Sequence, residues 1–290
     1  MGVLNLGSIN IDLVFEVPHI ATPGETVMSH ALSRGLGGKG ANTSVALARG
    51  GASVRHFGAI GRDGRDMVTK LETFGVDCSG VQVLDGETGQ AVIQVDEDGE
   101  NAITLLRGAN WDMPEAIVGE VVAAAKPGDW LVLQNETAHV PEAARRARGA
   151  GARVAYAAAP FDAGATTEVL SHTDLLALNH IEAAQLAEAT GRTAAEFGPD
   201  MVLVTHGADG ARLYCKGSDP LHQPAARAEA VVDTTAAGDT FFGFFLARLD
   251  AGAEVADALR VAAAASAIGV SRKGASASIP TLDEVMAALG

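Results

Sequence analysis

Two segments of the sequence combine glycines with residues that could bind phosphate or hydroxyl groups. The first, GLGGKGAN, places Gly35, Gly37 and Gly40 in the G-x-G-x-x-G spacing of dinucleotide-binding loops, ahead of a helix that we predict at Ala41–Arg49. Such a loop exposes backbone N–H groups and lets an anion approach them closely. The segment therefore raises the question of whether it holds the pyrophosphate of a nicotinamide cofactor or another ligand.

The surroundings of this loop argue against the two common phosphate-binding motifs. A dinucleotide loop directly follows a buried strand, whereas SHALSR precedes these glycines, and Asp63 matches the acidic position of that motif by spacing alone. A Walker A loop is also disfavoured, because Lys39 is followed by Gly40 instead of Ser or Thr. Free N–H groups and the Asn42 amide suit hydroxyl groups as well as phosphates. A glycine turn without a ligand remains the alternative.

The second segment, DTTAAGDTFFGFF at residues 233–245, predicts an anion site at the start of a buried helix. Its small residues allow an anion close to the backbone, and the first turn of the helix directs free N–H groups at it. Asp239 would repel a phosphate there unless it acts as a general base that takes a proton from an attacking hydroxyl group. Otherwise Asp239 only caps the helix or complements its dipole.

Two further clusters directly follow predicted strands. Asn179 and Glu182 stand in N-x-x-E spacing after LLAL, which is typical of a capping box, although the same side chains could organise a hydrated Mg²⁺ ion. After VLVT, the segment Thr205–Gly210 predicts a tight turn that either lines a nucleotide or simply leads into ARLYC. Both clusters therefore have a structural and a functional interpretation.

The elements that would position these residues follow an α/β pattern within one continuous unit. Strands alternate with Ala-rich helices in the second half, which predicts a mostly parallel sheet covered by helices on both faces. Ligands of such sheets bind beyond the carboxyl ends of the strands, which is where the unusual residues occur. The predicted strands are Val3–Ile9, Leu13–Val17, Val27–Leu32, a hairpin of Ala91–Val95 and Ala102–Leu106, and then Trp130–Gln134, Arg153–Tyr156, Leu175–Leu178 and Met201–Thr205.

Composition excludes several other classes of protein. A net charge of −15 argues against nucleic acid as a partner, because phosphate backbones require concentrated Lys and Arg. No apolar run is long enough to span a bilayer, so we expect no membrane partner. Cys78 and Cys215 have no metal-ligand spacing, and we expect a cytoplasmic protein. The histidines lack zinc spacing, and a G-x-S-x-G hydrolase motif is missing.

Taken in order, these segments resemble those of the ribokinase family of sugar kinases, of the phosphofructokinase-B type. The resemblance covers nearly the whole chain, from GSINIDLVF and TPGETV through GGKGAN and GETGQAVIQVDEDGENAITLLRGAN to LVLQNE, LNHIEA, VTHGADG, VVDTTAAGDTFFG and GVSRKGASASIP. It implies an α/β, ribokinase-like domain over residues 1–290, with a central, mostly parallel sheet, helices on both faces, and a small β-sheet lid. The lid would comprise about residues 12–35 and 88–107.

The resemblance also implies roles for individual residues. The implied catalytic base is Asp239, which also contacts the sugar, and the other implied sugar contacts are Asn10, Asp12, Gly38, Lys39, Asn42 and Glu136. The implied anion hole is the backbone of Ala236, Ala237 and Gly238. ATP is implied to lie along Asn179, Thr205, Gly207, Asp209, Gly210 and Gly238. The implied metal sites are a Mg²⁺ network with Glu182 and a K⁺ site at Asp233, Thr235, Gly269, Arg272, Gly274 and Ser278.

The implied reaction is transfer of the ATP γ-phosphoryl group to a primary hydroxyl of a small sugar, with D-ribose to ribose 5-phosphate favoured. A homodimer that pairs through the lid is also implied. A nucleoside, a ketohexose or another sugar remains open as acceptor. An NAD-dependent oxidoreductase is disfavoured, because the glycine loop is misplaced and DTTAAGD would have no role.

Three features depart from the family pattern. Ala157 and Ala158 stand where ribokinases usually have Asn-Pro, so one polar group near the phosphates is missing. Ala263 replaces a larger residue that often packs on adenine, and the stretch from Thr190 to Met201 is short. These changes bear on nucleotide affinity and on the choice of substrate, while Asp239 and both glycine segments are retained.

Overall fold

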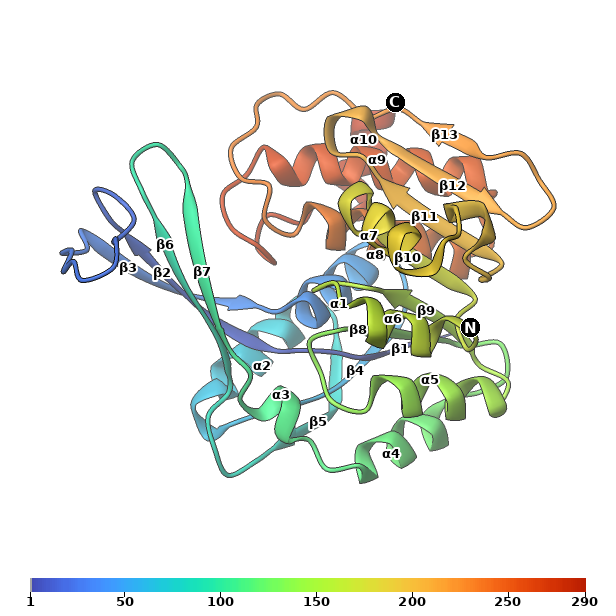
Figure 1. The fold of residues 1–290 in the computed structure, drawn as a ribbon, viewed down its shortest axis with the longest axis horizontal. Coiled ribbons are helices and arrows are strands. Elements are labelled where there is room, and N and C mark those ends of the chain that lie inside the picture. The colour runs from blue at the N-terminus through green and yellow to red at the C-terminus, as the bar shows by residue number, and fades with distance from the viewer. Residues whose placement is uncertain (1) are drawn as a thin grey trace.

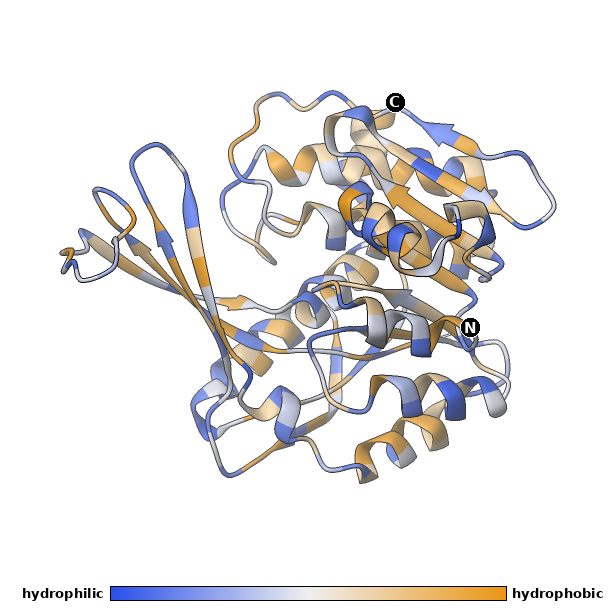
Figure 2. Ribbon diagram, in the orientation of Figure 1, coloured by the Kyte–Doolittle hydropathy of each residue, from blue (hydrophilic) through white to orange (hydrophobic). Residues whose placement is uncertain are grey.

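The computed structural model describes residues 2–290, and its centre is a nine-stranded sheet. Across the sheet the order is β13 (Leu221–Gln223), β12 (Ala211–Cys215), β11 (Met201–Thr205), β10 (Leu175–Asn179), β9 (Arg153–Ala157), β8 (Trp130–Gln134), β1 (Val3–Leu6), β4 (Val54–Ile60) and β5 (Asp77–Val83). The strands from β11 to β5 are parallel, and β12 and β13 add an antiparallel edge. Strands β1 and β8 are buried at every residue, as expected for parallel strands covered on both faces. Figure 2 shows hydrophobic residues, in orange, along strands of this sheet.

Helices cover both faces of this sheet, so the predicted α/β class is confirmed (Figure 1). One apolar core lies against α1 (Lys39–Arg49), α2 (Arg65–Thr73), α8 (Ala237–Asp250), α9 (Val255–Val270) and α10 (Leu282–Leu289). The other lies against α3 (Ala109–Asp112), α4 (Ala116–Ala124), α5 (Val140–Gly149), α6 (Ala163–Leu170) and α7 (His180–Thr190). Short 3₁₀ turns occupy Arg62–Gly64, Ala194–Glu196 and Gly207–Asp209. Within residues 2–290, no helix has the length and apolar character needed to cross a membrane.

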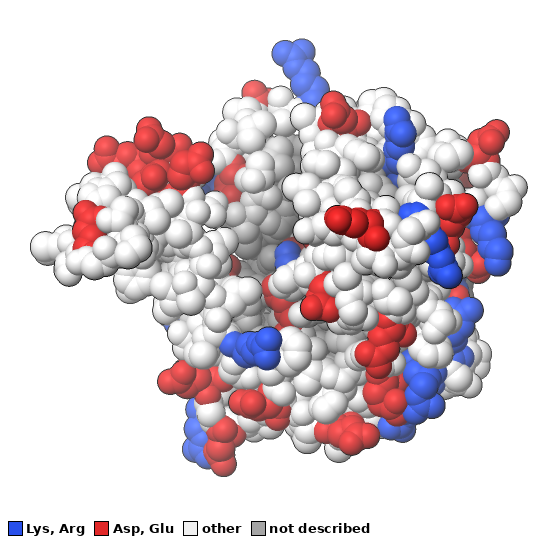
Figure 3. All heavy atoms as spheres, viewed as in Figure 1, with Lys and Arg blue, Asp and Glu red and all other residues white. Residues whose placement is uncertain are grey.

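A second sheet of four strands projects from the main body (Figure 1). Its order is β3 (Ala31–Gly37), β2 (Asn10–Glu16), β6 (Gly89–Val95) and β7 (Asn101–Leu106). The predicted hairpin is confirmed, because β6 and β7 pair in antiparallel register. The space-filling view shows a hollow between this sheet and the main body (Figure 3).

The structure corrects two of the predicted strands. Strand β1 ends at Leu6, and the chain crosses into the small sheet before Asn10, so Val3–Ile9 is not one strand. The prediction at Val27–Leu32 is also wrong, because β3 covers Ala31–Gly37 and pairs along the full length of β2. Most of β3 is exposed, so its residues lack the apolar alternation from which strands are predicted.

This correction also changes the argument about the glycine loop. A strand does lead into it, but that strand belongs to the small antiparallel sheet, whereas a dinucleotide loop follows a buried parallel strand. Asp63, the acidic residue at the matching distance, accepts bonds from the Thr88 backbone at 3.0 Å and the Thr88 hydroxyl at 2.7 Å. Asp63 therefore holds a loop together, and the oxidoreductase interpretation gains no support.

Candidate active site

The glycine turn allows α1 to begin directly against the end of β1. A Cβ on Gly40 would lie 2.3 Å from the Ser8 backbone nitrogen, and the Ala41 N–H donates to the Ser8 carbonyl at 2.8 Å. Gly38, before the helix, has a φ of 92°, a conformation that favours glycine. This close approach places the first residues of α1 at the carboxyl end of β1.

A carboxylate from the loop after β8 contacts both the end of β1 and the start of α1. Glu136 Oε2 accepts from the Ser8 hydroxyl at 2.5 Å and from the Lys39 backbone N–H at 2.9 Å. The loop after β8 is thereby tied to both the end of β1 and the start of α1. Glu136 and Lys39, both named as sugar contacts by the resemblance, thus lie side by side.

Asn10, at the start of β2, is fixed by a buried asparagine from α3. Asn110 Nδ2 donates to Asn10 Oδ1 at 2.8 Å, and Asn110 Oδ1 accepts from the Ile9 N–H at 3.0 Å. Asn10 and Glu136 line a cavity of about 540 Å³, whose wall also includes Arg107, Trp111, Asn135 and Phe161. The cavity lies within the size range of small-molecule sites.

Asp12 is a second carboxyl group in this region. Burial, and next the negative charge of Glu136, raise the pKa of Asp12 to about 7. A Cβ on Gly37, in the neighbouring strand β3, would lie 2.0 Å from the Asp12 carboxylate, so only glycine leaves room for this side chain. The carboxyl groups of Asp12 and Glu136 therefore share one partly dry environment.

Asp239 lies in the first turn of α8, half-buried, and is bonded to α1. The Asn42 side-chain amide donates to Asp239 Oδ2 at 3.0 Å. Burial raises the pKa of Asp239, whereas the positive charge of Lys39 and the bond from Asn42 lower it. The negative charge of Asp239 is likewise the largest of the effects that raise the pKa of Lys39. The two helices can approach because Gly243 of α8 faces Ala46 of α1, and a Cβ on this glycine would lie 2.4 Å from that of Ala46.

The start of α8 also forms one wall of a second cavity, of about 620 Å³. Ala236, just before the helix, has a φ of 60°, which turns the chain sharply into the first helical turn. Five residues that the resemblance assigned to the anion hole or to ATP line this cavity: Thr205, Gly207, Gly210, Ala237 and Gly238. Ala263 lines it as well. Ala237 and Gly238, which directly precede Asp239, therefore line a cavity of a size that suits a small molecule.

Three of the predicted nucleotide and magnesium residues lie outside this lining. Asn179 and Glu182 form the capping box of α7, in which the Asn179 N–H donates to Glu182 Oε2 at 2.7 Å. Asp209 lies exposed in a 3₁₀ turn. Burial raises the pKa of Glu182, Lys39 lowers it and Asp239 raises it, so these three charges lie close enough to interact. Among residues 2–290, no group of three or more His, Cys, Asp or Glu is arranged to bind a metal ion.

The predicted cation residues come from two segments that the structure joins. Asp233 accepts from the Thr235 N–H and the Gly274 N–H, both at 2.9 Å. The Asp233 N–H donates to the Val270 carbonyl, beside Gly269. Burial alone would raise the pKa of Asp233, but these bonds lower it.

The remaining two cation residues are arranged differently. The Arg272 side chain bonds Glu284 at 2.7 Å, and its backbone N–H donates to the Gly269 carbonyl at 3.0 Å. The Ser278 hydroxyl donates to the Ala275 carbonyl at 2.7 Å.

Sequence reasoning missed several residues that hold the site together. Ser8, Asn110 and Ser276 each bond a predicted site residue, and each lies within a segment that carried the family resemblance. Below the glycine turn, the buried His56 ring bonds the Ser44 hydroxyl at 2.9 Å and the Gly7 carbonyl at 3.1 Å. Burial lowers the pKa of His56 to about 4, so this histidine is a neutral structural residue.

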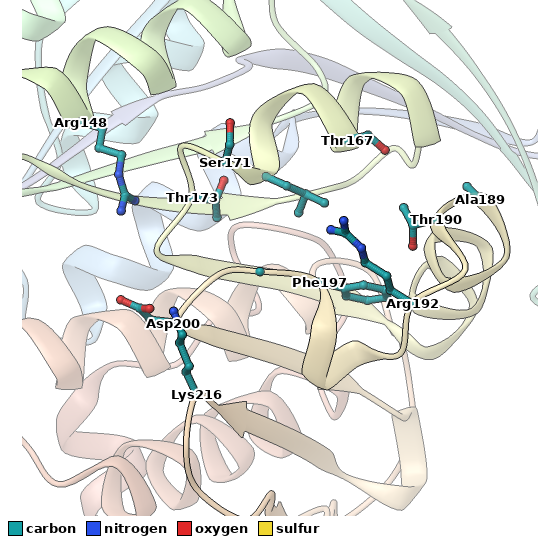
Figure 4. Close-up of a pocket in the computed structure, with 12 residues that line it drawn as sticks. Arg148, Thr167, Ser171, Thr173, Ala189, Thr190, Arg192, Phe197, Asp200 and Lys216 are labelled. Carbon is teal, nitrogen blue, oxygen red and sulfur yellow. The ribbon is translucent and has the colours of Figure 1, made fainter.

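A third cavity, of about 610 Å³, contains none of the predicted site residues (Figure 4). It lies at the amino ends of β10 and β11, where Thr173 and Asp200 precede these strands, and Arg148, Arg192 and Lys216 line it. Arg148 bonds Asp174 at 2.6 Å. Ligands of parallel sheets bind at the opposite, carboxyl end, so we do not assign the reaction to this cavity.

Comparison with known proteins gives a consistent result. Residues 2–282 match the family described as pfkB family carbohydrate kinase. The chain is 36% identical to a ribokinase of Haemophilus influenzae, with 97% of this chain and 96% of that protein covered. Among solved structures, it is similar to a ribokinase of Thermotoga maritima, with a TM-score of 0.89, 32% identity and coverage of 100% and 99%. It is also similar to an Arabidopsis thaliana ribokinase complexed with ribose and ATP, with a TM-score of 0.86, 29% identity and coverage of 99% and 98%.

Proposed function

Because the chain belongs to the pfkB family of carbohydrate kinases, we propose that this ATP-dependent enzyme phosphorylates D-ribose to ribose 5-phosphate. One observation carries the proposal: Asp239 lies at the start of α8 and is bonded to Asn42, while the neighbouring Ala237 and Gly238 line the 620 Å³ cavity. A base at that position can accept a proton from a hydroxyl group that attacks a phosphate held by the helix terminus.

In the proposed mechanism, ATP occupies the 620 Å³ cavity with its γ-phosphate at the N-terminus of α8. Asp239 takes the proton of the primary hydroxyl as the oxygen attacks phosphorus in line with the leaving group. The N–H groups from Ala236 to Gly238 stabilise the charge on the transferred group. The positive charge of Lys39, which lies close enough to change the pKa of Asp239, adds to this stabilisation.

The sugar would bind on the other side of Asp239. Asn10, Asp12, Asn42 and Glu136 offer amide and carboxylate groups, which form strong hydrogen bonds with hydroxyls in a closed site. We propose that the four-stranded sheet, including residues 12–35 and 88–107, closes over the sugar as a lid and excludes water. Residues 1–290 would then act as one kinase domain.

Two ions belong to this proposal. Bound Mg²⁺ would supply positive charge to the phosphates. Glu182, whose Oε2 already accepts the capping bond, would act on the waters that Mg²⁺ usually keeps. A K⁺ ion would stabilise the junction of residues 233–235 with 269–278. The Gly274 N–H bonds Asp233 and so joins the two segments, while the Arg272 side chain bonds Glu284. This arrangement suits a K⁺ site built from backbone carbonyl oxygens.

We further propose a cytoplasmic homodimer that pairs through the lid. The lid exposes several large apolar side chains, among them Leu32 at 58%, Ile103 at 55% and Leu105 at 50%. Exposed apolar groups on one sheet favour contact with a second copy. The free thiols of Cys78 and Cys215 fit a reducing compartment.

A second acceptor class is favoured by the 540 Å³ cavity. It extends beyond Asn10 and Glu136 to Trp111 and Phe161, and the Arg107 guanidinium lies 4.3 Å from the Trp111 ring centre. Aromatic side chains beside a sugar site suit a planar base, so a nucleoside is the alternative acceptor.

The test is ADP release from MgATP by the purified protein with D-ribose, 2-deoxyribose, fructose, several nucleosides or no acceptor, each with and without K⁺. We expect turnover that depends on ribose and increases with K⁺. Turnover with nucleosides alone would replace the substrate and keep the mechanism. Turnover with none of these acceptors would refute the proposed reaction.

A further inference from the structure

The side chain that holds Asp239 is itself held by a residue from a distant part of the chain. Asn42 Nδ2 donates to Asp239 Oδ2 at 3.0 Å, and Asn42 Oδ1 accepts from the Ser276 hydroxyl at 2.7 Å. Asn42 is 5% exposed and Ser276 is 2% exposed, so water has little access to replace either bond. A continuous line of hydrogen bonds therefore leads from Ser276 through Asn42 to Asp239.

Only one orientation of the Asn42 amide suits an ionised Asp239. With its nitrogen toward Asp239, the amide donates to the carboxylate, and its oxygen needs a donor on the opposite side. The Ser276 hydroxyl is that donor. In the reversed orientation the amide oxygen would face the carboxylate, and two acceptors would repel each other. Ser276 thus stabilises the orientation in which Asn42 binds the base.

Ser276 is positioned by contacts that do not involve Asn42. It follows α9, in a segment where the Gly274 N–H donates to Asp233 and the Ser278 hydroxyl donates to the Ala275 carbonyl. Because its own segment is anchored, Ser276 can hold Asn42 in place instead of following its movements.

We propose that Ser276 is a positioning residue for phosphoryl transfer, whose hydroxyl keeps the Asn42 nitrogen on Asp239 and so keeps this carboxylate directed at the acceptor hydroxyl. This inference rests on the proposed function, in which Asp239 is the base. Ser276 acts through Asn42 and not on the substrate. Its loss should therefore slow the chemical step and leave the nucleotide cavity unaffected.

The first test is the kinetics of Ser276→Ala with saturating MgATP and sugar. We expect kcat to fall about 10-fold, which is the scale of one lost hydrogen bond to a charged network, and KM for MgATP to stay within about twofold of wild type. Ser276→Thr keeps a hydroxyl and should restore most of kcat. Thr173→Ala is the matched control, because its buried hydroxyl donates to the Val169 carbonyl at 3.0 Å and Thr173 is not among the residues of the proposed site. It should leave kcat unchanged.

The second test needs no substrate. The Asn42 bond lowers the pKa of Asp239, so Ser276→Ala should move the titration of Asp239 to higher pH, read from its side-chain carboxyl signal by ¹³C NMR. The inference is overturned if Ser276→Ala keeps the wild-type kcat and titration, or if kcat falls only in proportion to a loss of folded protein. Wild-type turnover tests the proposed function separately, since the titration is measured without sugar or ATP.

Discussion

The ionised carboxylate of Asp12 should lower the free energy of unfolding of the sugar-free protein at alkaline pH. Burial and the nearby Glu136 raise the pKa of Asp12 from its ordinary 3.8 to about 7. Between these two pH values, the folded chain holds a proton that the unfolded chain releases. The free energy of unfolding therefore falls as pH rises through this window, and the loss is complete above pH 7. Replacing Asp12 with Asn removes the charge, so we expect this variant to be more stable than wild type at pH 8.

The size of the effect follows from the two pKa values. Their difference corresponds to at most about 4 kcal/mol, at about 1.36 kcal/mol for each tenfold change in proton affinity. Asp12 is only half-buried, and screening by solvent reduces this limit. We expect Asp12→Asn to gain about 1–2 kcal/mol at pH 8, and the gain to shrink toward zero as pH approaches 4.

Urea unfolding at several pH values measures this gain directly. Glu97→Gln, at an exposed position in the β6–β7 turn, removes the same charge and is the matched control, for which we expect no gain. Asp12→Asn should also weaken ribose binding in calorimetry, because a charged acceptor is lost. A variant that is less stable than wild type at pH 8, or a gain that does not depend on pH, would refute the reasoning.

Three further predictions concern the sugar site, the glycine turn and the lid. Asn110→Ala leaves Asn10 without its buried partner, so KM for the sugar should rise about 10-fold, with a smaller change in kcat. Gly40→Ala should lower the free energy of unfolding by more than about 3 kcal/mol in chemical denaturation, because its Cβ would lie 2.3 Å from backbone. Leu32→Lys places a charge on an exposed apolar side chain of the lid, on the face of the sheet opposite Asp12, and should convert the proposed homodimer to monomer in light scattering.

Each of these predictions has a control in the same chain. Asn101→Ala changes an exposed asparagine of β7 and should leave KM unchanged. Gly149→Ala adds a Cβ that meets nothing within 4 Å, so equal losses at both glycines would contradict the steric argument. Met286→Lys changes an exposed residue of α10, outside the lid, and should leave the assembly intact. An unchanged oligomer in Leu32→Lys would argue against pairing through that face.

The large sheet was predictable because burial leaves a clear pattern in the sequence. Strands β8 and β11 match their predicted bounds, and β9 and β10 differ by one residue at the end, since apolar runs mark buried parallel strands. Strand β3 was misplaced because exposed residues carry little pattern, and its bounds are set by pairing with β2. The four phenylalanines from Phe241 to Phe245 are buried, as their spacing on a helix indicates.

The site was only partly predictable. Glycines and acids with unusual neighbours pointed to residues 35–42 and 233–245, and the structure brings these segments together through Asn42 and Asp239. The bonds made by Ser8 and Ser276 join residues more than a hundred positions apart. No periodicity in one sequence predicts such contacts, because they depend on how the strands are ordered in the sheet.

The most direct test of the account is the turnover of Asp239→Asn with MgATP and the sugar that gives wild type its highest rate. Asparagine keeps the shape of the side chain but cannot accept the proton. We expect kcat to fall about 1,000-fold, with an unchanged melting temperature and similar KM values. Near-normal turnover by a folded Asp239→Asn protein would contradict the claim that this carboxylate is the base.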